Sequence, residues 1–404
     1  MVGRQIPTDT LNNKTDKPVA EQRTPAVAPA IVRQASFEDY EQIAALQTRN
    51  GLASICSRTW TALWMDNPAY HQWRADWPIG WVVQARGGKV VGFVGNVPVT
   101  YQFRGRELPV STPVSWVVDE GYRSYSMLLL DRLARQKGIG FLVATTVGPK
   151  AETGFKAFKF SKVPVGTWDE SEFWVTNYRE FSQSVLTSKS IPFSHVMSYP
   201  ISAGLFCRDK FKDLSGEVDY CCSNIEICSE FDGRFNRFWY SLAEQNPNVL
   251  LAVRTQETLA WHFRDALMHK SAWIVTASKG SALVAYAIFQ REDSPELRLK
   301  RVRLIDFQAL KGSEQMLRSF LSWMLHKCKS EGIHVLEITG RWLVRPGLPH
   351  VRAPYRRKLR SWTYYYKATN DDLSESLKDP EIWAPSSFDG DASLWLSAAL
   401  NSPA

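Results

Sequence analysis

The sequence predicts a mixed α/β protein made of two similar halves, each a twisted mixed sheet flanked by helices. Runs of β-branched and aromatic residues alternate with stretches of helical periodicity, which is the pattern of such folds. Hairpin signals split paired strand runs at 86–89 and again at 278–281. Three landmarks of the first half recur 187 to 197 positions later: Trp64 as Trp261, Trp81 as Trp273 and Asp119 as Asp306. We interpret these nearly constant offsets as a duplication that gives two tandem domains.

Composition places the chain among globular proteins. Its 404 residues are 44% hydrophobic and 22% charged, which excludes a wholly disordered, collagen-like or coiled-coil protein. No apolar run approaches the ~20 residues that cross a bilayer, and no charged start leads into an apolar stretch. We therefore expect a cytoplasmic protein without a membrane span.

The six cysteines are too few for a disulfide scaffold. Cys221, Cys222 and Cys228 lack the paired spacing of a zinc site. We expect buried, reduced thiols and no bound metal.

The elements of the first half follow from local signals. Its strand runs lie at 31–33, 81–85, 90–95, 114–119 and 141–144. Ser36 and Asp39 form a capping box that opens the first helix. Gly138 stands where a glycine that ends the second helix belongs. Because this second helix joins two strands by short connections, the sequence predicts a parallel pair with a right-handed crossover.

The second half repeats this order. Its strand runs lie at 273–275, 283–289, 304–306 and 333–338. The helix between the last two has an apolar face and is stopped at Gly332.

These elements divide the chain into five parts. Residues 1–30 are polar and proline-rich and contain no aromatic residue, so we expect a disordered tail. The two domains are expected at 31–175 and 240–368. A connecting segment at 176–239 joins them, and a C-terminal extension at 369–404 follows.

The net charge of +8 is concentrated in one segment. Between positions 341 and 360 seven basic residues occur without an acidic one: Arg341, Arg345, Arg352, Arg356, Arg357, Lys358 and Arg360. Such a segment favours an anionic partner such as a phosphate, a nucleotide or RNA. A solvated basic loop is the alternative.

Each half also has a strand-to-helix junction of the kind that binds anions through free backbone N–H groups and the helix dipole. In the first half this junction comprises Arg123, Ser124, Tyr125 and Ser126. In the second half it comprises Gly312, Ser313, Glu314 and Gln315, preceded by the cation Lys311. Ordinary helix starts have the same form, so the alternative is that neither junction binds a ligand.

Several short motifs resemble the GCN5-related N-acetyltransferase (GNAT) fold. They are Val32-Arg33-Gln34-Ala35 followed by Phe37-Glu38-Asp39, then Gly92-Phe93, Trp116-Val117-Val118, Tyr122-Arg123 and the run 155–160. A cluster of Trp60, Trp64 and Asn67-Pro68, loosely repeated at 261–263, resembles a bacterial tandem form from extracellular-polysaccharide biosynthesis. More distantly it is similar to the Fem peptidyl transferases of cell-wall assembly. The resemblance covers about residues 31 to 368.

This resemblance implies an acyl-CoA donor, such as acetyl-CoA, whose pyrophosphate lies on a loop of pattern Gln/Arg-x-x-Gly-x-Gly/Ala. In the first half the loop falls on 123–128, where Ser126 and Leu128 replace both glycines. A Cβ at these positions obstructs close approach of the backbone to phosphate. Phe155 stands where the family has a tyrosine that protonates the departing thiolate. The first half therefore resembles a catalytically decayed or substrate-binding copy.

The candidate catalytic residues are accordingly expected in the second half. Asp306 ends a central strand, where many enzymes place a general base. A capping or salt-bridged aspartate is the alternative. Tyr355 falls near the position of the family's thiolate-protonating tyrosine, and Lys311 with Gly312 retains a cation and a glycine for the donor.

Three functions are compatible with these observations. The leading one is acyl transfer from acyl-CoA to a small-molecule amine, such as an amino sugar or nucleotide sugar, with Asp306 as base and Tyr355 as acid. The second is aminoacyl-tRNA-dependent transfer of the Fem type, which the basic segment 341–360 favours. The third is a non-catalytic GNAT-like binding protein, which the degenerate phosphate loops favour.

Overall fold

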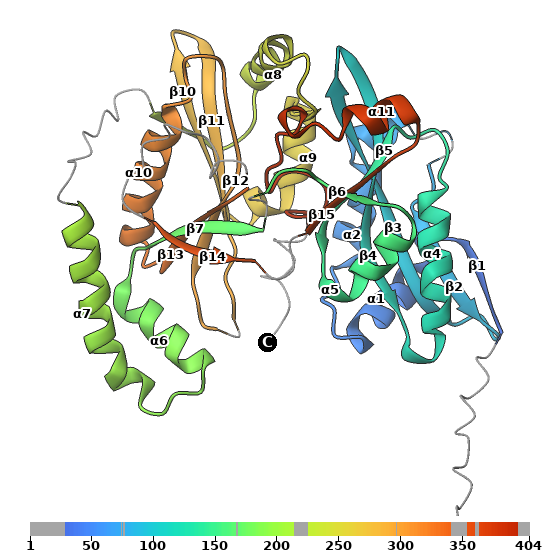
Figure 1. The fold of residues 1–404 in the computed structure, drawn as a ribbon, viewed down its shortest axis with the longest axis horizontal. Helices are drawn as coiled ribbons and strands as arrows, with labels where there is room; N and C mark the ends of the chain where they lie inside the picture. The colour runs from blue at the N-terminus through green and yellow to red at the C-terminus, as the bar shows by residue number, and fades with distance from the viewer. Residues whose placement is uncertain are drawn as a thin grey trace, which may run out of the picture.

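The computed structural model describes residues 29–73, 75, 77–166, 169–213, 225–295, 297–340, 354–359 and 363–394. The predicted disordered tail therefore lies outside the described residues apart from its last two positions. Two mixed sheets stand side by side, and helices α8 (Gly233–Gln245) and α9 (Gln256–Met268) lie between them (Figure 1). The predicted fold class, a mixed α/β protein with two sheets flanked by helices, is confirmed.

The first sheet has the strand order β1-β2-β3-β4-β5-β15-β6. Its strands are β1 (Ala30–Gln34), β2 (Gly80–Ala85), β3 (Val90–Phe103), β4 (Arg106–Val118), β5 (Phe141–Val147), β15 (Thr363–Ala368) and β6 (Ser161–Lys162). Neighbouring strands along this order pair antiparallel, except β4 and β5, which pair parallel. The short strand β9 (Leu251–Ala252) pairs with β3 beside this path.

The second sheet has the order β14-β7-β13-β12-β11-β10-β8. Its strands are β14 (Tyr355–Lys358), β7 (Glu170–Val175), β13 (Val335–Thr339), β12 (Arg301–Ala309), β11 (Ala282–Arg291), β10 (Ala272–Lys279) and β8 (Ile225–Cys228). Here β12 and β13 form the parallel pair, and the other neighbours are antiparallel. From β1 in one sheet and β8 in the other, the order of pairings is the same.

Each sheet also contains a strand from the other half of the chain. β15 and β9 come from the second predicted domain yet pair with β5 and β3 of the first sheet. β7 comes from the first predicted domain and pairs with β13 of the second sheet. The division at 31–175 and 240–368 remains a prediction, and these pairings cross it.

Further helices flank both sheets. Beside the first sheet lie η1 (Phe37–Asp39), α1 (Tyr40–Arg49), α2 (Ser57–Met65), α3 (Pro68–Trp73), η3 (Glu120–Tyr125), α4 (Ser126–Ala134), α5 (Pro149–Ala157), α11 (Asp371–Ser376) and η6 (Pro380–Ile382). Beside the second lie α6 (Tyr178–Ser188), α7 (Ser194–Asp213) and α10 (Met316–Ser330). Within the described ranges, no helix combines the length and apolar character needed to cross a membrane.

The local signals of the sequence correspond to observed contacts. The Ser36 N–H donates to Asp39 Oδ2 over 2.9 Å in the predicted capping box. Both hairpins form, and α4 and α10 each connect the two strands of a parallel pair. The expectation of buried thiols is wrong for Cys56 and Cys207, which are free and exposed.

A shared hydrophobic core joins the halves. It contains Tyr101 and Phe141 from the first sheet, Tyr286 from the second, and Trp239 and Phe263 from the helices between them, all buried. Burial of large aromatic side chains is the strongest apolar contribution to such an interface. The two halves are therefore packed into one unit.

Candidate functional site

The two strands of each parallel pair separate toward their carboxyl ends. β4 and β5 pair at Val110 with Phe141 and at Ser111 with Leu142, and no further pairing between them follows in the described residues. We call the opening between 112–118 and 143–147 the first fork. In open α/β sheets, ligands bind beyond the carboxyl ends of strands at such openings.

A bulge in β4 shapes the first fork. The register with β3 shifts between Phe93 and Gly95, so that Ser115 and Trp116 both lie opposite Val94. Ser115 has a φ of +53°, an uncommon backbone conformation for serine. Because a bulge bends its strand and re-aims its side chains, Trp116 faces the space between the strands.

A cavity of about 310 Å³ occupies the first fork. Two other pockets, described below, have volumes of about 70 and 20 Å³. The lining is mostly apolar and comes from β3, both fork strands, α4 and α5: Val94, Pro113, Trp116, Leu130, Leu133, Ala144, Val147, Ala151 and Phe155, among others. An apolar cavity with few polar groups is the usual form of a small-molecule site.

The C-terminal segment supplies the carboxylate of this cavity. Asp391 Oδ1 accepts hydrogen bonds from the Thr145 hydroxyl (2.5 Å) and the Thr145 N–H (3.3 Å), and Oδ2 accepts one from the Thr146 hydroxyl (2.6 Å). Burial raises the pKa of Asp391 above its ordinary value and outweighs these hydrogen bonds, which lower it. A carboxylate with a raised pKa in a cleft is a candidate general base.

Gly390 permits this close approach. It has a φ of +60°, and a Cβ there would lie 2.4 Å from Thr145 Cγ2. A residue with a side chain would therefore push Asp391 away from the strand.

Trp116 brings a hydrogen-bond donor to the same cavity. Its Nε1 is buried and has no hydrogen-bond acceptor among the described residues. Its ring packs edge-on against Phe155, with centroids 5.8 Å apart. A buried N–H without an acceptor costs about 1–3 kcal/mol, so this group is available to a ligand.

The predicted anion junction of the first half lies at the end of β4, beside the cavity. Arg123 is largely exposed, 3.7 Å from Glu120, and the Tyr125 hydroxyl accepts a hydrogen bond from the Ala30 N–H (3.0 Å). Ser124 is exposed, and Ser126 begins α4. The junction thus stands at the open end of the fork with an exposed cation.

The predicted base Asp306 lies in a buried network. It is fully buried and forms an ion pair with the equally buried Arg254 (2.8 Å). It also accepts hydrogen bonds from Tyr286 (2.8 Å), Gln308 (3.1 Å) and Ser386 (3.3 Å). This is the salt-bridged aspartate that the sequence left as the alternative.

The predicted acid Tyr355 lies elsewhere, on the edge strand β14. Its hydroxyl donates to Asp209 (2.9 Å), its ring stacks on Phe173, and the Arg208 guanidinium is 3.7 Å from the ring centroid. Burial, and then the bond to Asp209, raise the pKa of Tyr355. Two strands separate β14 from β12, and neighbouring strands are ~4.8 Å apart. The structure therefore does not bring Asp306 and Tyr355 together.

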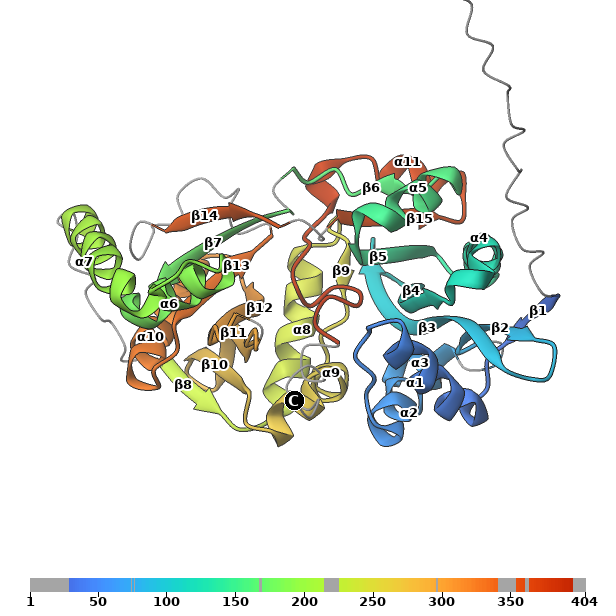
Figure 2. The ribbon, with the colours of Figure 1, turned by 90° about the horizontal axis from the view of Figure 1, so that it is seen from below.

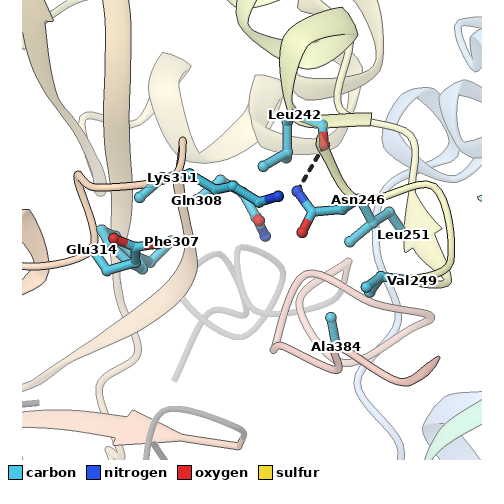
Figure 3. A pocket seen from close by; sticks show the side chains of 10 residues that line it. Leu242, Asn246, Val249, Leu251, Phe307, Gln308, Lys311, Glu314 and Ala384 are labelled. Carbon is cyan, nitrogen blue, oxygen red and sulfur yellow. Dashed lines mark hydrogen bonds between the residues drawn. The ribbon is translucent and has the colours of Figure 1, made fainter. Parts of the chain in front are cut away.

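The second predicted anion junction is occupied by its own side chains. The Gly312 N–H donates to Glu314 Oε2 (2.9 Å), and the Lys311 N–H donates to Gln245 Oε1 (3.0 Å). Lys311 and Glu314 line the pocket of about 70 Å³, into which Gln308 and Asn246 also point (Figure 3). Ser313 follows in the turn before α10. The Glu314 carboxylate therefore already accepts the hydrogen bond from the Gly312 N–H that a bound anion would need.

The second fork, between 304–309 of β12 and 338–339 of β13, is filled by the chain itself. Pairing of these strands ends at Arg303 with Glu337. Ser386 donates to Asp306 on one side, and the Ser387 hydroxyl lies 2.8 Å from that of Thr339 on the other. Both serines are buried. The C-terminal segment thus bridges the second fork before Asp391 reaches the first.

The basic segment 341–360 is described at 354–359. Arg356 pairs with Glu172 (2.7 Å) and Arg357 with Glu337 (2.5 Å). These two cations are neutralised within the second sheet. Arg341, Arg345, Arg352 and Arg360 lie outside the described residues.

The pocket of about 20 Å³ lies between the halves and includes His262. His262 Nε2 is 2.6 Å from the Ser393 hydroxyl, and burial lowers its pKa to about 3. Across the described ranges, no group of three or more His, Cys, Asp and Glu side chains is arranged to hold a metal ion.

Sequence reasoning missed Asp391, Thr145 and Thr146. The carboxylate and the hydroxyls are about 246 positions apart in the chain, so no motif connects them. The turn-forming run Asp389-Gly390-Asp391 was the one local sequence feature that marked the position of this carboxylate.

Comparison with solved structures defines the class of this fold as GNAT-like. The chain is similar to Saccharomyces cerevisiae N-myristoyltransferase with bound myristoyl-CoA, at 11% identity, with 88% of this chain and 86% of that chain covered and a TM-score of 0.51. It is also similar to a GCN5-related N-acetyltransferase from Kribbella flavida, at 10% identity, with coverages of 85% and 71% and a TM-score of 0.50. No protein-family model and no curated protein matches the sequence. At these identities the likeness establishes the fold alone.

Proposed function

We propose that this protein transfers an acyl group from acyl-CoA to an amine, with the donor thioester bound in the first fork. The observation that carries the proposal is the apolar cavity of about 310 Å³, which holds the half-buried carboxylate of Asp391 and an indole N–H without an acceptor among the described residues. A protein of the same fold binds myristoyl-CoA, which supports a CoA donor.

In this proposal Asp391 is the general base. An ammonium acceptor must lose a proton before its nitrogen can attack, and a carboxylate of raised pKa is a better-matched acceptor for that proton. The nitrogen–carbon bond then forms as the carbon–sulfur bond breaks. The ammonium proton goes to Asp391 before the attack, and the second nitrogen proton goes to the departing sulfur, so that CoA leaves as the thiol.

Trp116 is proposed to stabilise the reacting carbonyl. Its Nε1–H has no acceptor in the described part of the protein and is fixed by contact with Phe155. A preorganised donor at the carbonyl oxygen stabilises the negative charge that develops during attack.

The proposed site lies in the first half, whereas the sequence favoured the second. Arg123, Ser124, Tyr125 and Ser126 keep their predicted role, now as the entry for the anionic part of the donor. Asp306 is proposed to stabilise the second fork, because its carboxylate is already used by Arg254.

The finer parts of the sequence interpretation remain proposals. They are acetyl-CoA as donor, an amino sugar or nucleotide sugar as acceptor, a role in polysaccharide biosynthesis, a cytoplasmic location and a tandem origin. The matching order of pairings in the two sheets supports the last of these. Within the described part of the basic segment that favours the Fem-type alternative, Arg356 and Arg357 are engaged in ion pairs and Lys358 is exposed.

Titration calorimetry with CoA, acetyl-CoA and longer acyl-CoAs tests the donor site. Gly148 lines the cavity with a φ of −80°, and a Cβ at this position would meet no other atom within 4 Å. Gly148→Leu should therefore leave the backbone in place and narrow the cavity, and we expect at least about tenfold weaker donor binding.

Gly233→Leu, at another uncrowded glycine outside the cavity lining, is the matched control. It should bind the donor like the unaltered protein. Absence of acyl-CoA binding by the unaltered protein, or equal losses in the two variants, would overturn the proposal.

A further inference from the structure

The helical pair α6 and α7 exposes an apolar surface that the proposed reaction does not use. The pair lies at the end of the molecule farthest from the first sheet (Figures 1 and 2). Phe193 is 81% exposed, Phe211 is 76% exposed and Val196 is 63% exposed. Large apolar side chains at such exposure mark an interaction surface when they are contiguous.

The exposed residues are contiguous along one face of α7. Helical spacing places five exposed residues on this outer face: Val196, Pro200, Ala203, Cys207 and Phe211. The opposite face, with Ser198 and Asp209, is buried. A helix at a protein surface normally turns its charged residues outward. Here the outward residues are apolar or small, which indicates that this face binds a partner.

The exposed charges named around this face are cations, and the acidic Asp213 ends α7 beyond Phe211. From 181 to 208 the sequence contains no Asp or Glu. Lys189 and Lys210 are exposed toward opposite ends of α7, and Arg179 is exposed with its guanidinium 4.6 Å from the Tyr199 ring centroid. Asp209 is buried and paired with Arg208. The surface therefore combines apolar residues with cations, which fits an anionic and apolar partner.

The size of the face argues against a second copy of the chain. From Val196 to Phe211 the helix rises ~22 Å at about 1.5 Å per residue. Met197, Tyr199, Ile201 and Phe206 beside this face are also exposed. Even half of the surface of a helix of that length and ~10 Å diameter offers only roughly 350 Å², whereas a stable interface needs about 800 Å² from each partner. Like charges on two copies would also repel. A helix that lies in a bilayer interface, with aromatic residues at its ends and cations at its rim, requires no larger area.

We propose that the outer face of α7, with Phe193, docks the protein on the surface of an anionic lipid bilayer. The apolar residues enter the boundary between headgroups and acyl chains, and Lys189 and Lys210 contact the anionic headgroups. This docking places the protein at a membrane and is independent of the proposed acyl transfer.

Cosedimentation of the full chain with lipid vesicles tests the proposal. We expect binding to vesicles of phosphatidylglycerol and phosphatidylcholine, weaker binding to phosphatidylcholine alone, and a decrease in binding with added salt. Val196→Ser with Phe211→Ser should weaken binding at least about tenfold. Lys189→Glu with Lys210→Glu should weaken it at least about fivefold.

The matched control is Tyr240→Ser with Met268→Ser, which removes similarly exposed apolar side chains from α8 and the end of α9. This control should bind vesicles like the unaltered protein, and circular dichroism should show all variants folded. Absence of vesicle binding at low salt would overturn the proposal. So would a concentration-dependent dimer that the Val196→Ser, Phe211→Ser variant abolishes, because the face would then bind a second copy.

Discussion

The two forks begin alike and differ in what fills them. In each, a parallel pair separates toward its carboxyl end and a helix starts beside the opening. The first fork holds a cavity of about 310 Å³ with Asp391 at its wall. The second holds Ser386 and Ser387, which contact Asp306 on β12 and Thr339 on β13.

The difference shows that one topology serves two purposes in this chain. The first fork has a cavity and an indole N–H without an acceptor among the described residues, so it can bind a ligand. In the second fork, hydrogen bonds and an ion pair already engage the polar groups, so these groups are not free to bind a ligand. The same C-terminal segment fills the second fork and supplies the carboxylate of the first.

Loss of the carboxylate in the second fork should have the largest effect on stability. Asp306→Asn leaves Arg254 buried without its ion-pair partner, which costs about 3–5 kcal/mol. Urea unfolding measures this loss. A roughly hundredfold loss of turnover in a variant of unchanged stability would instead support Asp306 as the general base.

The stability of the second sheet should also depend on pH through Glu337. Burial alone would raise the pKa of Glu337, but Arg303, Arg357 and Arg301 outweigh it and lower the pKa to about 2 from 4.5. Folding thus favours the ionised form of Glu337. Its contribution to the free energy of unfolding is complete above pH ~4.5 and is lost as the pH falls toward about 2. At about 1.36 kcal/mol per pKa unit the contribution is roughly 3 kcal/mol.

Chemical unfolding from about pH 3 to about pH 7 measures this dependence. Glu337→Gln should be less stable at neutral pH and should lose less stability on acidification. An identical pH dependence in the variant and the unaltered protein would contradict the assignment to Glu337.

Loss of the carboxylate in the first fork should act on turnover instead. Asp391→Asn should lower turnover about a hundredfold and leave donor binding nearly intact, which is the usual scale for a general base. Because burial raises the pKa of Asp391, the acid limb of the rate profile should lie above the ordinary aspartate range and vanish in the variant. Asp389→Asn is the control, since Asp389 bonds Tyr101 and Ser386 away from the cavity. Equal losses of turnover would contradict a specific role for Asp391.

The smallest effect is expected where the chain crosses the second fork. Ser387→Ala removes the hydroxyl that bonds Thr339 and should cost about 1 kcal/mol of stability, measured by urea unfolding. Donor binding should not change. If this variant instead weakened donor binding, the two forks would be coupled through the C-terminal segment.

The sequence by itself determined the local structure. The glycine pair at 87–88 and Gly280 mark the two hairpin turns, the Ser36–Asp39 box opens a helix, and Gly138 and Gly332 end two others. These features depend on neighbours a few positions apart, so the pattern of residues is sufficient to predict them. The same reasoning predicted the order of hairpin, strand, helix and strand that both halves share, and hence the fold class.

The tertiary structure alone decided the strand exchange and the contents of the forks. β7 and β15 pair outside the halves that encode them, because strand pairing is settled by the hydrogen-bonding partners available in space. Asp391 reaches Thr145 across 246 positions, and its surroundings rather than its neighbours in sequence bury it and raise its pKa. Asp306 has the sequence position of a base, yet a buried arginine from 52 positions away makes it half of an ion pair. Charge pairing and burial act over distances in space that local sequence patterns do not record.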